Sequence, residues 1–252
     1  MTCNGLPTNG TCDFGFTDLD GWCDRSFNFQ GACSGYDTDT CFCSDQNYPM
    51  EPEVCDGGWA WSWIELACVS SSPILIDVSG DGFALTDLIN GINFDLTGSG
   101  TQRRLSWVAA GSDDSWLVLD RNSNGVIDNG LELFGDATIQ PALASGEDRN
   151  GFRALAMFDA RDSGGNEDGK ISIADSVFST LLLWQDLNHN GISEPTELHT
   201  LSDLGLVSID LKYKKSKNTD QYGNEFRYRS KVRDVKGSTL NHWAWDVFLK
   251  TN

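Results

Sequence analysis

The chain has 252 residues, of which 37 are acidic and 18 basic, so its formal net charge at pH 7 is -19. With 39% hydrophobic residues it carries enough apolar mass for a core, which argues against a disordered chain. The negative charge disfavours nucleic acid as a partner, and no apolar run approaches the roughly 18–20 residues that span a bilayer. The first residues lack the basic start and apolar stretch of a signal peptide, so we expect the chain to be part of a longer protein.

Every cysteine of the chain lies in a predicted first domain, residues 1–72, which carries eleven acidic groups and one basic group. An even number of cysteines in a short Gly- and Asp-rich stretch predicts an irregular, disulfide-bonded region in an oxidising compartment. A zinc site is the weaker alternative, because no CxxC pair is present. We therefore expect a secreted or cell-surface protein, with the disulfide pairing left open. The predicted disulfide cysteines are Cys3, Cys12, Cys23, Cys33, Cys41, Cys43, Cys55 and Cys68.

The predicted second domain, residues 73–252, begins with an acidic part that has twenty-two acidic and seven basic groups between residues 73 and 210. Four segments in this part repeat one pattern. A short apolar run leads into an aspartate, oxygen-bearing side chains follow at alternate positions, and a glycine comes next. The segments begin at Asp77, Asp120, Asp159 and Asp186.

Calcium chemistry explains this spacing. Calcium takes six to eight oxygen ligands at roughly 2.3–2.6 Å, so the chain must fold sharply around the ion. Counting from the first aspartate, positions 1, 3 and 5 supply side-chain oxygens, a glycine at 6 permits the turn, position 7 supplies a carbonyl and a carboxylate near 12 closes the shell. One copy alone is as easily a surface turn. Four copies favour several bound calcium ions, and magnesium is disfavoured because it retains its waters.

The copies match this pattern to different degrees. The copy from Asp186 to Glu197 is complete, and the copy at Asp159 fits if residues 160–165 bulge out. In the copy at Asp120 the closing acid comes one position late, and in the copy at Asp77 no closing acid is evident. A fifth and weakest copy begins at Asp95. Asparagine replaces aspartate at several positions, which predicts weak binding, roughly 10⁻⁴ to 10⁻³ M. The predicted calcium ligands are Asp77, Ser79, Asp81, Phe83, Asp120, Asn122, Asn124, Val126, Asp128, Glu132, Asp159, Asn166, Asp168, Lys170, Asp175, Asp186, Asn188, Asn190, Ile192 and Glu197.

An ordered string of short motifs extends through about residues 73–213. The motifs are residues 73–77, 80–82, 93–96, 107–108, 119–120, 133–136, 150–152, 154–155, 183–186 and 201–204. They resemble the EF-hand-like calcium-binding domains of secreted bacterial proteins, of which the best-described relative is the self-processing module of iron-regulated RTX proteins. This resemblance implies a domain that folds around calcium.

The resemblance also implies an activity that this sequence argues against. In the family, the module cleaves its own chain at an Asp-Pro bond once calcium has folded it, through an anhydride formed by the aspartate carboxylate. The corresponding bond here joins Ser72 to Pro73, and the sequence contains no Asp-Pro bond. A hydroxyl cannot form that anhydride. The resemblance therefore implies the calcium fold without the cleavage.

From Val207 onward the hydrophobic period changes to two, which predicts a small antiparallel sheet over about residues 206–249 with one apolar and one basic face. The basic face is most simply solvated, and an anionic polysaccharide is its alternative partner. The predicted fold class is α+β, in which EF-hand-like calcium loops with short helices and a small antiparallel sheet follow the disulfide-rich irregular region. The basic side chains are Lys212, Lys214, Arg227, Arg229, Lys231 and Arg233.

No catalytic motif is evident in the sequence, so we do not expect an enzyme. Trp59, Trp61 and Trp63 share one side of an extended segment, where they could stack on sugars, although such a stripe more often forms a core. We predict a secreted calcium-binding module with a structural or adhesive role. Self-processing and carbohydrate binding are the alternatives. Calcium is the expected ligand, and the possible macromolecular partners are a cell-surface protein or a polysaccharide.

Overall fold

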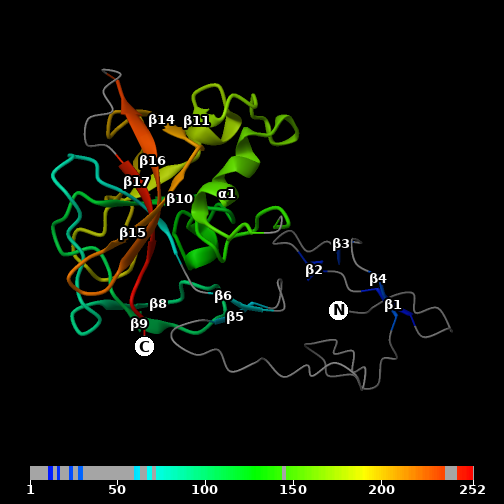
Figure 1. Ribbon diagram of the computed structural model, residues 1–252, viewed down its shortest axis with the longest axis horizontal. Coiled ribbons are helices and arrows are strands. Elements are labelled where there is room, and N and C mark those ends of the chain that lie inside the picture. The colour runs from blue at the N-terminus through cyan, green and yellow to red at the C-terminus, as the bar shows by residue number, and fades with distance from the viewer. Residues whose placement is uncertain are drawn as a thin grey trace. The chain divides into compact units, whose positions relative to one another are not determined.

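The computed structural model describes residues 72–143, 146–235 and 243–251, together with the backbone of six short strands nearer the N-terminus (Figure 1). The chain divides into two compact units, Met1–Glu53 and Val54–Asn252. In the first unit, β1 (Thr11–Asp13) pairs with β4 (Asn28–Gln30), and β2 (Phe16–Thr17) pairs with β3 (Cys23–Asp24). The region predicted to be irregular therefore contains short strands. The predicted disulfides lie outside the residues whose side chains are described.

The second unit is built on a nine-stranded antiparallel sheet with the order β11-β14-β16-β17-β7-β10-β12-β13, in which β15 also pairs with β16. Its strands are β7 (Ile74–Ile76), β10 (Ser115–Val118), β11 (Lys170–Ser172), β12 (Leu182–Trp184), β13 (Leu198–Thr200), β14 (Leu206–Asp210), β15 (Lys214–Thr219), β16 (Glu225–Asp234) and β17 (Trp243–Phe248). Separate pairs are formed by β5 (Ala60–Ser62) with β6 (Ala67–Val69), and by β8 (Ile92–Phe94) with β9 (Arg103–Leu105).

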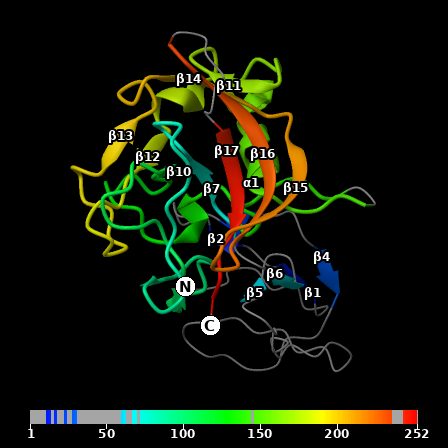
Figure 2. The same ribbon diagram turned by 60° about the vertical axis from the view of Figure 1, so that its left-hand side comes forward.

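The central strands of this sheet are buried on both faces. Figure 2 shows β17 lying between β16 and β7. Because alternate residues of a strand point to opposite faces, Ile74 and Ile76 enter one hydrophobic cluster while Leu75 enters another. The neighbouring strand β10 divides in the same way, with Leu117 in the first cluster and Trp116 in the second. The sheet therefore separates two cores.

Different elements cover the two faces. The first cluster is covered by α1 (Gly151–Ala156), which contributes Phe152 and Leu155. This helix starts at Asn150, whose side chain accepts the Arg153 N–H, as expected for an N-cap residue. The second cluster is covered by β8, β9 and the segment after them, where the Trp107 ring lies 4.6 Å from that of Trp116. The candidate sites lie in the loops around these cores.

This architecture shows that the α+β, EF-hand-like prediction is wrong. In the described residues α1 is the only α-helix, and it has six residues. Strands rather than helices lead into the segments at Asp77, Asp120 and Asp186. The apolar runs before these aspartates are only three or four residues long, too short for a helix and suited to a strand buried on both faces. The remaining helical turns are η1 (Gly130–Glu132), η2 (Met157–Asp159), η3 (Arg161–Ser163) and η4 (Ser176–Ser179).

The predicted C-terminal sheet is present, but as part of the larger sheet and without a single apolar face. Phe226 packs in the second cluster and Tyr228 in the first, because a β-bulge between them shifts the register of β16 against β17. Val207, which was expected to face the core, is 37% exposed beside a second irregularity between β14 and β16. A bulge changes the inward-facing set, which an alternation rule cannot anticipate.

Among the described residues, no helix is long and apolar enough to cross a bilayer. The stripe of three tryptophans at residues 59–63 lies outside the residues whose side chains are described. Its role as a core or as a sugar-binding surface therefore stays a prediction.

Candidate metal sites

Five loops of the second unit share one hydrogen-bonding arrangement at their first aspartate, by which each loop is named below. One carboxylate oxygen accepts the backbone N–H of position 5, and the other accepts the N–H of the glycine at position 6. The distances from these two nitrogens are 3.2 and 2.9 Å in the Asp77 loop, 3.1 and 2.6 Å in the Asp95 loop, 3.2 and 2.7 Å in the Asp120 loop, 3.2 and 2.9 Å in the Asp159 loop, and 3.0 and 2.8 Å in the Asp186 loop.

The backbone of these loops is left-handed at positions 4 and 6. At position 6 this explains the glycine, since other residues rarely adopt positive φ. At position 4, however, three loops place a residue with a side chain in this conformation, at a cost of roughly 1–2 kcal/mol each. These residues are Ser123, Glu167 and His189, with φ of 58°, 61° and 59°. The shared shape is thus kept even where the sequence makes it unfavourable.

The Asp186 loop is closed by Glu197, as its spacing predicts. One oxygen of this carboxylate, Oε1, accepts the Leu187 N–H at 3.0 Å. The other oxygen, Oε2, is buried without a hydrogen-bond partner in the described structure, and Glu197 is only 4% exposed. Burial is the main cause that raises the pKa of Glu197, because it disfavours the charged form, and the adjacent side chain of Glu194, within hydrogen-bonding reach, raises it further. A cation in the loop would supply the missing partner.

A second acid of this loop, Glu194 at position 9, was missed by the sequence prediction. Its Oε1 accepts the side-chain N–H groups of Asn188 and Asn190 at 3.3 and 2.8 Å, and its Oε2 is also buried without a partner. The predicted ligand Asp128 holds the same position in the Asp120 loop. Comparing the two loops position by position would have identified Glu194.

In the Asp120 loop, the late closing acid does reach the loop. Glu132 is 4% exposed, and its two oxygens accept the N–H groups of Arg121 and Asp128 at 3.0 and 2.7 Å. The 3-10 turn η1 ends at Glu132, which brings its side chain back over the loop. Burial is the main cause that raises the pKa of this carboxyl. The side-chain N–H groups of Asn122 and Asn124 reach Asp128 at 2.8 Å each, as in the Asp186 loop.

The insertion in the Asp159 loop closes on itself. Gly165 N–H donates to the Ala160 carbonyl at 2.9 Å, and η3 occupies the residues between them. A side chain at Gly165 would collide with the Asp159 backbone. After the insertion, the closing acid Asp175 accepts the Asn166 N–H at 3.2 Å. The structure thus brings the predicted ligands of this loop together across the insertion.

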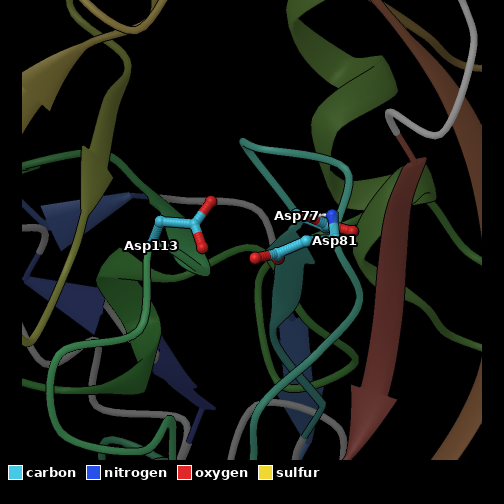
Figure 3. A group of neighbouring side chains, drawn as sticks. All are labelled: Asp77, Asp81 and Asp113. Carbon is cyan, nitrogen blue, oxygen red and sulfur yellow. Dashed lines mark hydrogen bonds between the residues drawn. The ribbon is translucent and has the colours of Figure 1, made fainter.

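The Asp77 loop obtains its closing acid from a distant part of the chain. Asp113, in the segment between β9 and β10, accepts the Ser79 N–H at 2.7 Å. Figure 3 shows Asp113 facing Asp77 and Asp81, and an oxygen of each lies within 4.8 Å of the others. The next residue, Asp114, binds the Ala84 N–H, and its burial raises its pKa to about 6. The sequence prediction missed Asp113 because it searched only within the loop.

Other predicted ligands lie at position 7, where the backbone carbonyl was expected to contribute. The N–H groups of Val126 and Ile192 donate to the side-chain oxygens of the position-5 asparagines at 2.8 and 2.7 Å, and both side chains are exposed. Lys170 N–H donates to Asp168 in the same manner at 3.2 Å. At position 7 of the Asp77 loop, by contrast, the ring of Phe83 packs against that of Phe226, with 5.3 Å between the ring centroids. The Asp120, Asp159 and Asp186 loops therefore share this contact as well.

The donors gathered in these loops fit calcium better than a softer metal. They are carboxylate, amide and hydroxyl oxygens, the ligands of a hard cation, whereas zinc and copper favour sulfur and imidazole. The imidazole of His189 is engaged elsewhere, since its two nitrogens lie 2.5 and 2.7 Å from the carbonyls of Val108 and Asn90. The unpartnered oxygen of Glu197 is the structural observation that favours an ion most strongly.

The Asp95 loop has the same backbone but fewer charges. The hydroxyls of Thr97 and Ser99 lie within hydrogen-bonding distance of Asp95, at 3.2 and 3.4 Å. The carboxylate is therefore satisfied by its own loop. This agrees with its place as the weakest copy.

The Ser72–Pro73 bond lies in a closely packed part of the core. Ser72 is 2% exposed, and its N–H donates to Asp136 at 2.9 Å while its hydroxyl accepts the Asp136 N–H at 3.2 Å. Gly135 approaches so closely that a side chain there would meet the Ser72 carbonyl. Ser72, which the family resemblance places where the aspartate of the cleaved Asp-Pro bond would stand, is thus buried and carries a hydroxyl in place of a carboxylate.

The fold and the loops define a class of protein: an antiparallel β-sheet domain that presents several acidic, oxygen-lined loops. The family model of the SPM domain matches residues 74–250, and the chain belongs to this family. It is also 39% identical over 190 residues to the iron-regulated protein FrpA of Neisseria meningitidis serogroup C. That alignment covers 72% of this chain and 16% of the relative's length.

These matches confirm the predicted relation to iron-regulated RTX proteins of bacteria. They also correct the range of residues over which this resemblance was predicted. The resemblance was placed at about residues 73–213, whereas the family match continues to residue 250. The difference has a structural reason, because β16 and β17 insert between β14 and β7 in the central sheet. The C-terminal strands are therefore part of the same domain.

Proposed function

We propose that this chain is a secreted calcium-binding module with a structural or adhesive role, whose sheet domain is stabilised by several calcium ions. The observation that carries the proposal is the buried Glu197 carboxylate, which has one oxygen without a partner and closes a loop lined by oxygen donors. Three further loops, beginning at Asp77, Asp120 and Asp159, gather carboxylates in the same arrangement. Membership of the SPM domain family supports this proposal.

The charge of the domain supports a role for the ion in stability. Without a cation, the clustered carboxylates repel one another and carry the penalty of burial. A ligand that binds only the folded state stabilises it by about 1.4 kcal/mol per site at ten times the dissociation constant. Weak sites of this kind would fill in the calcium concentrations found outside cells, which agrees with the proposed secretion. The proposed partner, a cell-surface protein or a polysaccharide, would then meet the calcium-loaded form.

Calorimetric titration of the full chain with calcium tests the proposal. We expect about four sites with dissociation constants of roughly 10⁻⁴ to 10⁻³ M, and much weaker heats with magnesium. E197Q should lose one site, while E147Q, on an exposed glutamate that pairs with Arg153, should lose none. A denaturing gel after incubation should show one intact band, because residue 72 is a serine. Absence of calcium-dependent heat would overturn the proposal, and new bands would favour self-processing instead.

A further inference from the structure

A buried hydrogen bond joins two of the candidate calcium loops directly. The Ile127 N–H of the Asp120 loop donates to the Ser193 hydroxyl of the Asp186 loop at 2.7 Å. Both residues are 2% exposed, and both hold position 8 of their loops. The bond is therefore shielded from water, where a hydrogen bond is stronger and its loss more costly than at the surface.

The neighbours of these two residues are the groups that would hold the ions. Ile127 lies between Val126 and Asp128, which are positions 7 and 9 of its loop. Ser193 lies between Ile192 and Glu194, which are the same positions of the other loop. An ion that fixes the ligands on either side of one partner also fixes that partner. The second loop then has less conformational freedom to lose when it binds its own ion.

The Asp159 loop has no such connection in the described structure. Its insertion is bound to Ser176, whose hydroxyl donates to the Gly164 carbonyl at 3.1 Å. Its far end is bound to Leu211, whose N–H donates to the Gly169 carbonyl at 2.9 Å. It also lies against the opposite core, because Ile171 packs in the first cluster while Ile127 packs in the second.

We propose that calcium binds the Asp120 and Asp186 loops with positive cooperativity, transmitted by the Ile127–Ser193 hydrogen bond, and binds the Asp159 loop independently. This inference rests on the proposed function. Each of the two loops gathers three carboxylates, so a loop that holds one divalent ion stays net negative. The first ion still makes the potential at the second loop less negative, so the hydrogen bond must outweigh this effect for binding to be cooperative. The carboxylates are Asp120, Asp128 and Glu132 in one loop, and Asp186, Glu194 and Glu197 in the other.

The test follows each loop separately by nuclear magnetic resonance during a calcium titration of the full chain. The amides of Gly125, Gly169 and Gly191 each donate to the first aspartate of their own loop, so each reports one site. E132Q disables the Asp120 loop with little change of volume. We expect it to weaken calcium binding at Gly191 by roughly 5–150-fold, the usual range for coupled sites, and to leave Gly169 unchanged. E197Q should weaken binding at Gly125 by the same factor.

Variants that remove the Ile127–Ser193 hydrogen bond itself complete the test. S193A should weaken binding at both Gly125 and Gly191, and should add no further loss at Gly191 when combined with E132Q. S176A is the matched control, because it removes a loop hydroxyl from the Asp159 loop, and it should leave Gly125 and Gly191 unchanged. If the wild-type chain binds calcium but E132Q leaves the Gly191 curve unchanged, the coupling is overturned and the proposed function stands. If no glycine responds to calcium in the wild type, both are overturned.

Discussion

Asp113 illustrates how a single residue can complete a site from a distant part of the chain. Its carboxylate lies with those of Asp77 and Asp81, within 4.8 Å, where three negative charges repel one another unless a cation joins them. We therefore predict opposite effects of D113N in the two states. The variant should melt at a higher temperature than the wild type in EDTA, because one repulsive charge is gone, and should gain less from calcium.

The affinity of the Asp77 loop provides the direct measurement. Loss of groups that merely orient ligands commonly costs about 10–100-fold in metal affinity, so loss of a ligand should cost at least about tenfold. The Gly82 amide, which donates to Asp77, reports this site by resonance. D162N, on an exposed aspartate of η3, is the control and should leave Gly82 unchanged. An unaltered Gly82 titration in D113N would show that Asp113 is not a ligand.

Asp246 predicts a pH dependence of stability that is separate from the metal loops. It is fully buried on β17, where its Oδ2 accepts the Gly151 N–H at 2.5 Å. Burial is the main cause that raises its pKa well above the usual 3.8. Between pH 4 and the raised pKa, the unfolded chain loses this proton while the folded chain keeps it. The unfolded state then binds fewer protons, so stability falls as pH rises through this window.

The predicted consequence concerns the slope of stability against pH. D246N removes the titrating group and keeps an oxygen for Gly151, so its stability should fall less steeply than that of the wild type above pH 4. The difference in slope has an upper limit of about 1.4 kcal/mol per pH unit. Urea unfolding in EDTA at several pH values measures it, with D162N as an exposed control. Parallel curves for D246N and the wild type would mean that Asp246 is ionised in the folded state.

At the scale of elements, the loops depend on the sheet for their position. The indole N–H of Trp107 donates to Asp186 at 2.8 Å inside the second core, which fixes the carboxylate that begins the Asp186 loop. Loss of such a supporting hydrogen bond commonly costs about 10–100-fold in metal affinity. W107F should therefore weaken calcium binding at the Gly191 amide by this factor.

Trp116 offers a closely matched control for this prediction. Both indoles are fully buried, but the Trp116 N–H has no partner in the described structure. W116F therefore creates a cavity of similar size without removing a hydrogen bond to a ligand, and it should lower the melting temperature with little change at Gly191. Equal losses of affinity in the two variants would show that cavity formation, rather than the hydrogen bond, is responsible.

The elements also show which parts of the fold could be predicted from sequence. The predicted segments fold into loops of one shape because their residue spacing is local, and the sharp turn at each glycine follows from the same residues. Their role as calcium ligands stays a prediction. The strands that lead into them were not predicted, since a short apolar run such as residues 74–76 has no periodicity to distinguish a buried strand from a helix. Asp113 was missed for a different reason. Its contact with Ser79 spans 34 residues and exists only once the sheet has formed.

At the scale of the whole molecule, the acidic charge is concentrated where the candidate ligands lie. Residues 73–210 hold twenty-two acidic groups against seven basic ones, whereas residues 211–252 hold four against ten. Part of this basic charge packs on aromatic rings, with the Arg229 guanidinium 4.6 Å from the Trp243 ring. The two parts of the domain sequence therefore differ in charge, and cations bound in the acidic loops would reduce this imbalance.

Thermal melting of the full, oxidised chain in EDTA and in millimolar calcium tests the dependence of this fold on calcium most directly. Four sites at ten times their dissociation constants would add about 5–6 kcal/mol, which for a domain of this size corresponds to a rise of roughly 10–20 °C in melting temperature. Magnesium at the same concentration should give a much smaller rise, because it retains its waters. Coincident melts in EDTA and calcium would contradict the proposal, and the repeated loops would then be turns without an ion.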